Sequence, residues 1–296
     1  MNPEEYVRKQ YRRKPAAENL TFNEAMKALK AKGKTVHHFG FGQSPFPVPE
    51  CLVTSLQKNA HERQYIGGKG LLPLRQELVA WHREMDGFDF LEDQLLIGPG
   101  SKELISLLIS VFNGDILLPA PSWISYRHQI DFAQQKYHLV NTSYETRFEI
   151  TTQSLEEILS KLDPQKPKLL LLNSPNNPTG MIMSKDHLLA ISSVCDRHNV
   201  VVLSDEIYAR ITFNAQHHSI YSVYPQKTIV VTGISKCFGA GGWRLGYMMF
   251  PKSLSGLQMA VEAAASNTYS CVSSPAQYAL THVCLIRFKV AAIASS

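Results

Sequence analysis

Short runs of apolar residues recur along the chain from about residue 70, and most of them lack the polar alternation of a half-exposed strand. A β-strand that is covered on both faces is typically a continuous run of leucine, isoleucine and valine. We therefore predict five such strands, at residues 94–97 (QLLI), 115–118 (DILL), 168–173 (KLLLLN), 200–204 (VVVLS) and 228–232 (TIVVT).

Segments with helical spacing lie between these runs. Residues 101–112 are predicted to form a helix with Ser101 as N-cap, and Ser154 and Glu157 have the spacing of a capping box. A third helix is expected to begin at Ser184 and to end near His198. Strands that alternate with helices indicate an α/β domain with a mostly parallel sheet.

The bulk properties narrow the class of protein. A chain of 296 residues with 44% hydrophobic content is long enough for one large domain or two unequal ones. The net charge of +5 is scattered, which argues against nucleic-acid binding, and no apolar run has the length of a membrane span. The five cysteines form no CxxC pair, so neither a disulfide framework nor a zinc site is expected. With acidic residues close behind Met1, these features predict a cytoplasmic protein.

The residues directly after each predicted strand carry the candidate chemistry, because ligands of parallel α/β sheets bind beyond the carboxyl ends of the strands. The first strand leads into GPGSKE (98–103), whose glycines and helix start suit a phosphate group, although a tight turn explains them equally well. Trp123 follows the second strand and either fills the core or stacks on a flat ligand. Asn177 follows the third strand within NSPNNPTG, a turn sequence in which the next proline holds its backbone extended.

The last two strands are followed by ionisable residues. Asp205 is either a helix N-cap or a buried carboxylate that needs a partner, and Tyr208 lies three residues further on. Lys236 and Arg244 lie in GISKCFGAGGWRLG (233–246), a segment too rich in glycine for a stable helix and an unusual setting for a lysine that only solubilises a surface. Together the five strand ends suit one ligand, an aromatic heterocycle with a phosphate and an aldehyde. That ligand is pyridoxal phosphate.

These motifs resemble those of the class I/II aminotransferases, which are fold-type-I pyridoxal-phosphate enzymes. SKCFGAGGWRLG (235–246) is similar to the family pattern SKxFxxxGxRxG, and NSPNNPTG, SDEIY (204–208) and GPGSKE resemble three further family motifs in the family's order. Upstream, FGFGQSPFPVPE (39–50) and QYIGGKGLLPLR (64–75) resemble two N-terminal motifs. The resemblance covers about residues 35–285.

The resemblance implies a role for each matching residue. Lys236 is implied to form the Schiff base with the cofactor and then to act as general base, while Asp205 faces the pyridine nitrogen. Asn177 and Tyr208 would hydrogen-bond the ring hydroxyl oxygen, and Trp123 would cover the ring. Gly42 is implied to contact the substrate. The cofactor phosphate is implied to be bound by Gly100, Ser101, Lys102 (through its backbone N–H), Ser235 and Arg244, and by Tyr65 of a neighbouring subunit. A homodimer is therefore implied.

The resemblance also implies a three-layer large domain and an incomplete small domain. We expect residues 1–45 to belong to the small domain, residues 46–275 to form the cofactor-binding domain, and residues 276–296 to begin a linker helix. The family pattern continues past this length with an arginine that binds the substrate α-carboxylate, so we expect a C-terminally truncated form. Arg287, the only arginine after Arg244, is not given that role.

The leading functional expectation is transamination between an amino acid and a 2-oxo acid. A carbon–sulfur lyase or a related eliminating enzyme would use the same cofactor residues and would differ only on the substrate side. A non-catalytic protein that binds the cofactor and dimerises is the third alternative.

Overall fold

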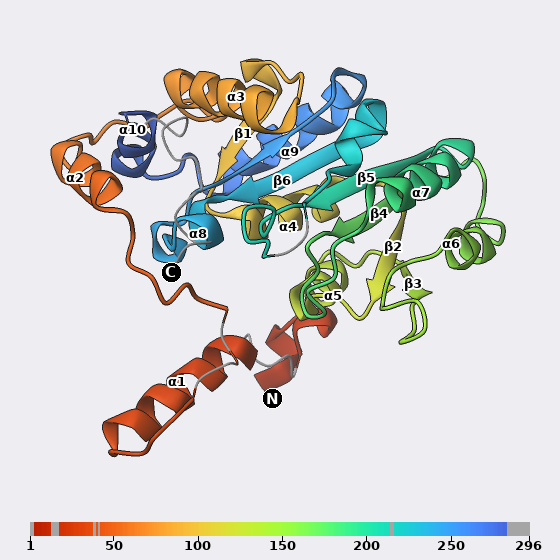
Figure 1. The fold of residues 1–296 in the computed structure, drawn as a ribbon, viewed down its shortest axis with the longest axis horizontal. Helices are drawn as coiled ribbons and strands as arrows, with labels where there is room; N and C mark the ends of the chain where they lie inside the picture. Colours follow the sequence, from red (N-terminus) through yellow and green to blue (C-terminus); the bar gives the residue numbers. More distant parts are fainter. Residues whose placement is uncertain (1–2, 13–17, 38–39, 41, 214–215, 283–296) are drawn as a thin grey trace.

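The computed structural model describes residues 3–12, 18–37, 40, 42–213 and 216–282, and within them seven strands form a single sheet (Figure 1). The order across the sheet is β1-β7-β6-β5-β4-β2-β3. Among these described strands, β7 pairs antiparallel with β1 and β6 and the other four pairs are parallel, so the predicted α/β class with a mostly parallel sheet is confirmed. The strands are β1 (Leu95–Gly98), β2 (Asp115–Ala120), β3 (Tyr137–Asn141), β4 (Lys168–Asn173), β5 (Val200–Asp205), β6 (Thr228–Gly233) and β7 (Gly246–Met249).

All five predicted strands are present, with ends that shift by at most two residues. The two strands that the apolar pattern did not predict are β3 and β7. β3 lies at the edge of the sheet, and four of its five residues are partly or fully exposed, so it has no continuous apolar run. β7 is fully buried but has only four residues and begins with a glycine.

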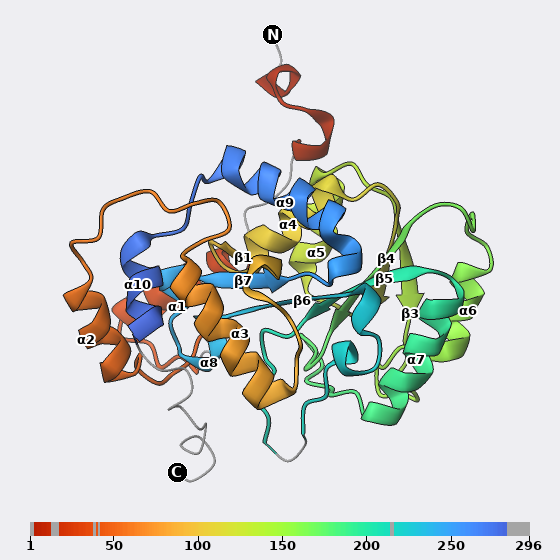
Figure 2. The same ribbon diagram turned by 90° about the horizontal axis from the view of Figure 1, so that it is seen from above.

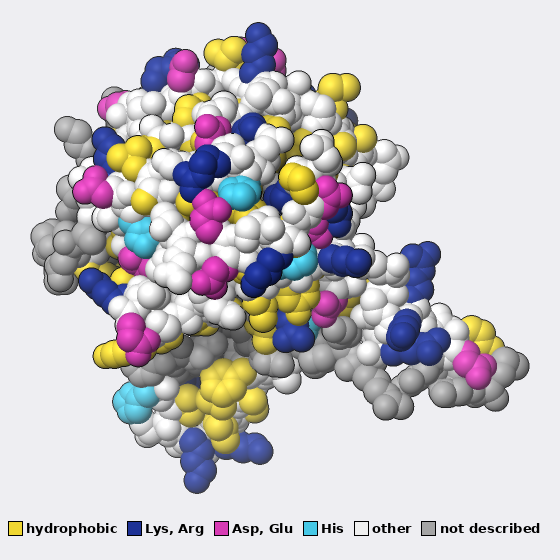
Figure 3. Space-filling view, turned by 90° about the vertical axis from the view of Figure 1, so that its right-hand side faces the viewer, with side chains coloured by type: hydrophobic (Ala, Val, Ile, Leu, Met, Phe, Trp, Pro, Cys, Tyr) yellow, Lys and Arg dark blue, Asp and Glu magenta, His cyan; other side chains and the backbone are white. Residues whose placement is uncertain are grey.

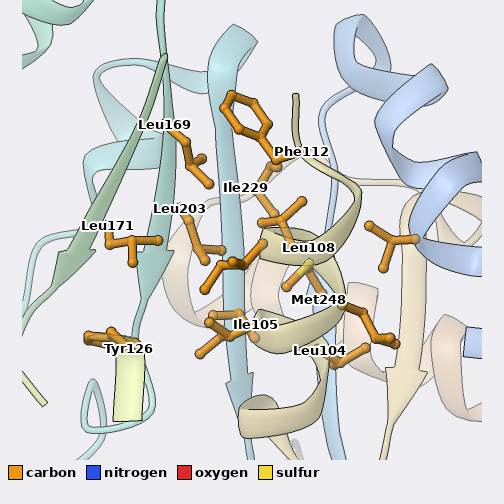
Figure 4. Close-up of a cluster of buried hydrophobic side chains, with 14 of the residues drawn as sticks. Leu104, Ile105, Leu108, Phe112, Tyr126, Leu169, Leu171, Leu203, Ile229 and Met248 are labelled. Carbon is orange, nitrogen blue, oxygen red and sulfur yellow. The ribbon is translucent and has the colours of Figure 1, made fainter. Parts of the chain in front are cut away.

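Helices cover both faces of the sheet and make it the middle of three layers (Figure 2). One face packs against α4, α5 and α9 through a cluster of leucine, isoleucine and aromatic side chains (Figure 4). The other face packs against α2, α3 and α10 at one end and against α6 and α7 at the other. The helices are α1 (Glu18–Ala31), α2 (Glu50–Lys58), α3 (Leu72–Asp86), α4 (Ser101–Val111), α5 (Ile124–Phe132), α6 (Thr152–Leu159), α7 (Lys185–Arg197), α8 (Ile234–Cys237), α9 (Ser255–Thr268) and α10 (Ser274–His282).

The helix starts match the predictions in one case and correct them in two. Ser184 caps α7 as predicted, by accepting a hydrogen bond from the His187 N–H at 3.2 Å. Ser101 is not an N-cap but the first residue of α4, because Gly100 occupies the cap position with φ 88°. At α6 the capping box joins Thr151 to Ser154 through two reciprocal 3.0 Å hydrogen bonds, so the predicted pairing of Ser154 with Glu157 is wrong.

The N-terminal part projects from the body of the molecule, with α1 extending away from the sheet (Figure 1). Positive and negative side chains are interspersed over the face shown in Figure 3, so no field of one sign dominates there. Among the described residues, every helix is too short or too polar to cross a bilayer. Residues 283–296, which include Arg287, lie outside the described part of the chain, and the domain limits at residues 45 and 275 stay predictions.

Candidate active site

The start of α4 lies directly against β7, because a glycine leaves room for it. Gly246 pairs with Gly98 of β1 on one side and with Gly233 of β6 on the other. A Cβ atom at Gly246 would lie 2.5 Å from the backbone nitrogen of Ser101 and 2.7 Å from the carbonyl carbon of Gly100. The first turn of α4 is thereby held close to the end of β6, where the segment with Lys236 begins.

Arg244 lies over the turn that opens α4. Its guanidinium donates hydrogen bonds to the carbonyl oxygens of Pro99, at 2.9 Å, and Gly241, at 2.8 Å. A Cβ atom at Gly100 would collide with this guanidinium. The side chain is exposed, and its five N–H donors exceed these two bonds. Arg244, Ser101 and the neighbouring backbone N–H groups therefore form an electropositive surface around the helix start, which suits an anion.

Lys236 lies in α8, a four-residue helix that directly follows β6. The segment is helical at this point, contrary to the expectation from its glycine content, because Gly233 precedes the helix and the other glycines, from Gly239 onward, follow it. The ε-amine donates a hydrogen bond to the carbonyl oxygen of Gly42 and lies 5.6 Å from the ring centre of Tyr208. Burial and the nearby charge of Arg244 lower the pKa of Lys236, although the charge of Asp205 opposes them. A lysine in this setting reaches the neutral, nucleophilic state more easily.

Asp205 ends β5 and is almost fully buried, with 4% of its surface exposed. It caps no helix, because the residues that follow it form turns. One carboxylate oxygen accepts a 2.6 Å hydrogen bond from the Tyr126 hydroxyl, and the other accepts a 3.2 Å bond from the Ile207 N–H. Burial raises the pKa of Asp205 to about 6. Of the two predicted alternatives, the buried carboxylate with a partner is therefore the correct one.

Asn177 and Tyr208 meet at the same edge of the sheet. A hydrogen bond with Asn177 lowers the pKa of the Tyr208 phenol, whereas burial and the charge of Asp205 raise it and prevail. The backbone N–H of Asn177 donates to the side-chain oxygen of Asn173 at 2.8 Å. This bond fixes the turn after β4 relative to the strand.

Trp123 immediately precedes α5 and is half-buried at the edge of the apolar cluster between α4 and the sheet, so its predicted stacking on a ligand stays a prediction. Its ring packs edge-to-face on Tyr126 at a centroid distance of 5.2 Å, and the Lys102 ammonium lies 4.9 Å from its centre. Burial and the charge of Arg244 lower the pKa of Lys102. Tyr65 is 89% exposed, and its expected role at a neighbouring subunit stays a prediction.

Three residues around Asp205 and Tyr208 were not predicted from the sequence. Tyr126 and Asn173 hold Asp205, and Glu206 is buried on the opposite side of the same segment. The Glu206 carboxylate accepts hydrogen bonds from the hydroxyls of Ser204 and Ser219 and lies 3.1 Å from a ring nitrogen of His217. Tyr126 lies three residues after Trp123, but this spacing does not show that its hydroxyl faces a carboxylate 79 residues away.

The model of the family described as aminotransferase class I and II matches residues 34–286. The chain belongs to this family. It is 32% identical over 270 residues to the asparagine–oxo-acid transaminase of Streptococcus mutans, covering 88% of this chain and 67% of that protein. The aspartate aminotransferase of Geobacillus stearothermophilus is 32% identical, with the same two coverages.

The solved structure of Thermus thermophilus aspartate aminotransferase with maleate has a TM-score of 0.82 at 26% identity and covers 90% of this chain and 69% of that one. The chain thus spans about two thirds of the length of the relatives it matches. Members of this aminotransferase family depend on pyridoxal phosphate, so the predicted family, fold and cofactor are confirmed.

Proposed function

We propose that this chain transfers an amino group between an amino acid and a 2-oxo acid, with Lys236 as the residue that binds the cofactor aldehyde. The observation that carries the proposal is the convergence of a partly buried amine, a buried carboxylate and an exposed arginine at the carboxyl ends of β6 and β5 and the start of β7. When bound, pyridoxal phosphate supplies an aldehyde that condenses with amines and a pyridine ring that withdraws electrons from the substrate α-carbon.

The residues present fit each part of this cofactor. The phosphate would bind at the start of α4, to Ser101, the Lys102 N–H and the Arg244 guanidinium, with Ser235 from α8. The planar fork of arginine suits phosphate oxygens. Gly100 has no side chain, so the Arg244 guanidinium can lie close to the start of α4, which stays open to the phosphate. The anion would thus be held by two backbone segments that Gly246 brings together.

The ring would lie over the ends of β4 and β5. Asp205 is the buried anion that favours a protonated ring nitrogen, while Asn177 and Tyr208 would bind the ring hydroxyl oxygen. Trp123 would cover the ring face. Asp205 acts here by holding a proton at the nitrogen, and burial strengthens that interaction because water does not screen it.

Lys236 would move the proton at the substrate α-carbon. Its lowered pKa favours the neutral amine that such a base requires, and the carbonyl oxygen of Gly42 orients its N–H. A Cβ atom at Gly42 would lie 3.5 Å from this nitrogen and 3.7 Å from the Tyr208 hydroxyl, so Gly42 borders the space in which the substrate would lie.

Several wider assignments belong to the same proposal. Aspartate and asparagine are the first amino acids to test, because relatives carry these substrates in their names. The exposed Tyr65 supports a homodimer in which it contacts the neighbouring cofactor phosphate. The division at residues 45 and 275 and the cytoplasmic location also remain part of this proposal.

The test is reductive trapping. Protein loaded with pyridoxal phosphate is treated with borohydride, and the labelled peptide is identified by mass spectrometry. We expect the label on Lys236, its loss in Lys236→Ala, and its retention in Lys102→Ala, which removes the other partly buried amine near Arg244. A label that stays on another lysine in Lys236→Ala contradicts the assignment.

The reaction class is tested with loaded protein and aspartate, asparagine or a sulfur amino acid. Formation of pyridoxamine phosphate, with 2-oxoglutarate restoring the original form, supports transamination. Release of pyruvate or 2-oxobutyrate with ammonia indicates the eliminating alternative. A spectrum that no amino acid changes indicates a non-catalytic protein.

A further inference from the structure

Tyr126 places a buried phenol against the carboxylate of Asp205. The tyrosine lies in the first turn of α5 and is 3% exposed, and Figure 4 shows it beside the apolar cluster that fills the space between α4 and the sheet. Its hydroxyl donates to the Asp205 carboxylate at 2.6 Å, and both side chains are shielded from water. Hydrogen bonds to a charged acceptor in such surroundings are the strong ones.

We propose that Tyr126 is a positioning residue that keeps the Asp205 carboxylate ionised and fixed in orientation, ready for the cofactor ring. The proposal rests on the proposed function of Asp205 as the partner of the ring nitrogen. It assigns Tyr126 no contact with the cofactor, because the hydroxyl acts through the carboxylate.

The electrostatic balance at Asp205 supports this role. Burial raises the pKa of Asp205 to about 6, and the hydrogen bonds from Tyr126 and the Ile207 N–H oppose that rise. Among the charged neighbours, Glu206 raises this pKa further and Lys236 lowers it. Burial and the charge of Asp205 raise the pKa of Tyr126 well above 10, so the phenol keeps its proton and donates it to the carboxylate. The carboxylate is therefore ionised at neutral pH by a narrow margin, to which the phenol contributes.

The backbone around Asp205 is held on both sides. The side chain of Asn173 donates to the Asp205 carbonyl oxygen at 2.8 Å while accepting the Asn177 N–H. Asp205 also pairs in register with Asn173 of β4 and Val231 of β6. Because the carboxylate is almost fully buried, loss of the Tyr126 hydroxyl leaves one of its oxygens without that donor.

The experiment measures the affinity for pyridoxal phosphate between pH 5.5 and 8.5 in the wild type, Tyr126→Phe, Asp205→Asn and the double variant. We expect Tyr126→Phe to weaken binding roughly tenfold near pH 6.5 and less at pH 8.5, because the pH at which binding is half lost moves upward. In the Asp205→Asn background the same change should alter affinity less than about twofold, since the coupled partner is gone. Tyr224→Phe is the matched control, because it removes a buried phenol that donates to the Val200 carbonyl oxygen at 3.0 Å, and its affinity should be unchanged.

Three results would overturn the inference. The first is an unchanged pH midpoint in Tyr126→Phe, and the second is a loss of affinity that persists in full in the Asp205→Asn background. The third is an infrared difference spectrum, wild-type apoprotein minus Asp205→Asn, that shows a protonated Asp205 at pH 8. This measurement requires no variant of Tyr126. If Asp205→Asn itself leaves affinity and cofactor spectrum unchanged, the failure lies instead in the proposed function of Asp205.

Discussion

Asp205 should cost the protein stability when no cofactor is bound. Its carboxylate is almost fully buried, and the two hydrogen bonds that it accepts do not compensate for lost hydration, since its pKa rises from the ordinary 3.8 to about 6. Asp205→Asn replaces this charge with a neutral amide of the same shape. We therefore expect the variant to stabilise the apoprotein at neutral pH while it weakens cofactor binding.

The magnitude follows from the two pKa values. The folded state binds the Asp205 proton more tightly than the unfolded state, so stability falls as the pH rises from 3.8 through about 6 and is constant above that. At about 1.4 kcal/mol for each pKa unit, the full cost of ionisation is about 3 kcal/mol. Asparagine has one acceptor oxygen where the carboxylate has two, and the weakened hydrogen bond costs about 1 kcal/mol. A net gain of about 2 kcal/mol at pH 8 is expected.

The assay is urea unfolding of the apoprotein at pH 5 and pH 8. The advantage of Asp205→Asn over the wild type should shrink by about 1.4 kcal/mol at the lower pH, because the wild-type carboxylate is then mostly protonated. Asp163→Asn serves as control, since Asp163 is exposed and should show no such change. An advantage that is equal at the two pH values, or a destabilised variant at pH 8, would show that ionisation of Asp205 carries no such cost.

Two further substitutions test the backbone and the ion pairs around the site. Gly100→Ala should lower the free energy of unfolding in urea by about 1–3 kcal/mol, because φ 88° is open essentially to glycine alone. It should also weaken cofactor binding, because the new methyl group displaces Arg244. Gly242→Ala is the control and should change neither measurement, because its methyl group meets no atom within 4 Å. Asp86→Ala should cost about 2–3 kcal/mol, because it leaves Arg210 and His82 without their carboxylate. Burial alone would raise the pKa of Asp86, but His82 and Arg210 outweigh it and the pKa is lowered, so the difference from wild type should persist above pH 3.8 and fade in stronger acid.

The strands in the middle of the sheet could be predicted because burial on both faces leaves a direct record in the sequence. The runs of β4, β5 and β6 contain little besides leucine, isoleucine and valine, and each is present within one residue of its predicted end. β3 and β7 leave no such record. An edge strand keeps polar residues, and a four-residue strand gains its stability from its neighbours rather than from its own composition.

The candidate site shows a similar division. Asp205, Asn177 and Lys236 could be singled out because each follows a recognisable strand, and the rule for parallel sheets brings such positions together. Tyr126 and Asn173 could not, because what matters about them is a hydrogen bond across the fold. The Tyr126 bond joins positions 79 residues apart, and no local pattern encodes it. The same holds for Gly246, whose contact with Ser101 depends on how β1 and β7 pair.

The segment from Ser204 to Arg210 shows why the residues of the site and those that support it occur side by side. Asp205 and Tyr208 face the candidate cofactor site, whereas Glu206 and Arg210 face the opposite way. Glu206 is held by Ser204, Ser219 and His217, and Arg210 pairs with Asp86 and lies 4.4 Å from the ring centre of Trp81. The described residues 206–213 form no helix that could fix these side chains, so side-chain bonds on the far side do so instead. The segment can therefore present a carboxylate and a phenol at fixed positions although it consists of turns.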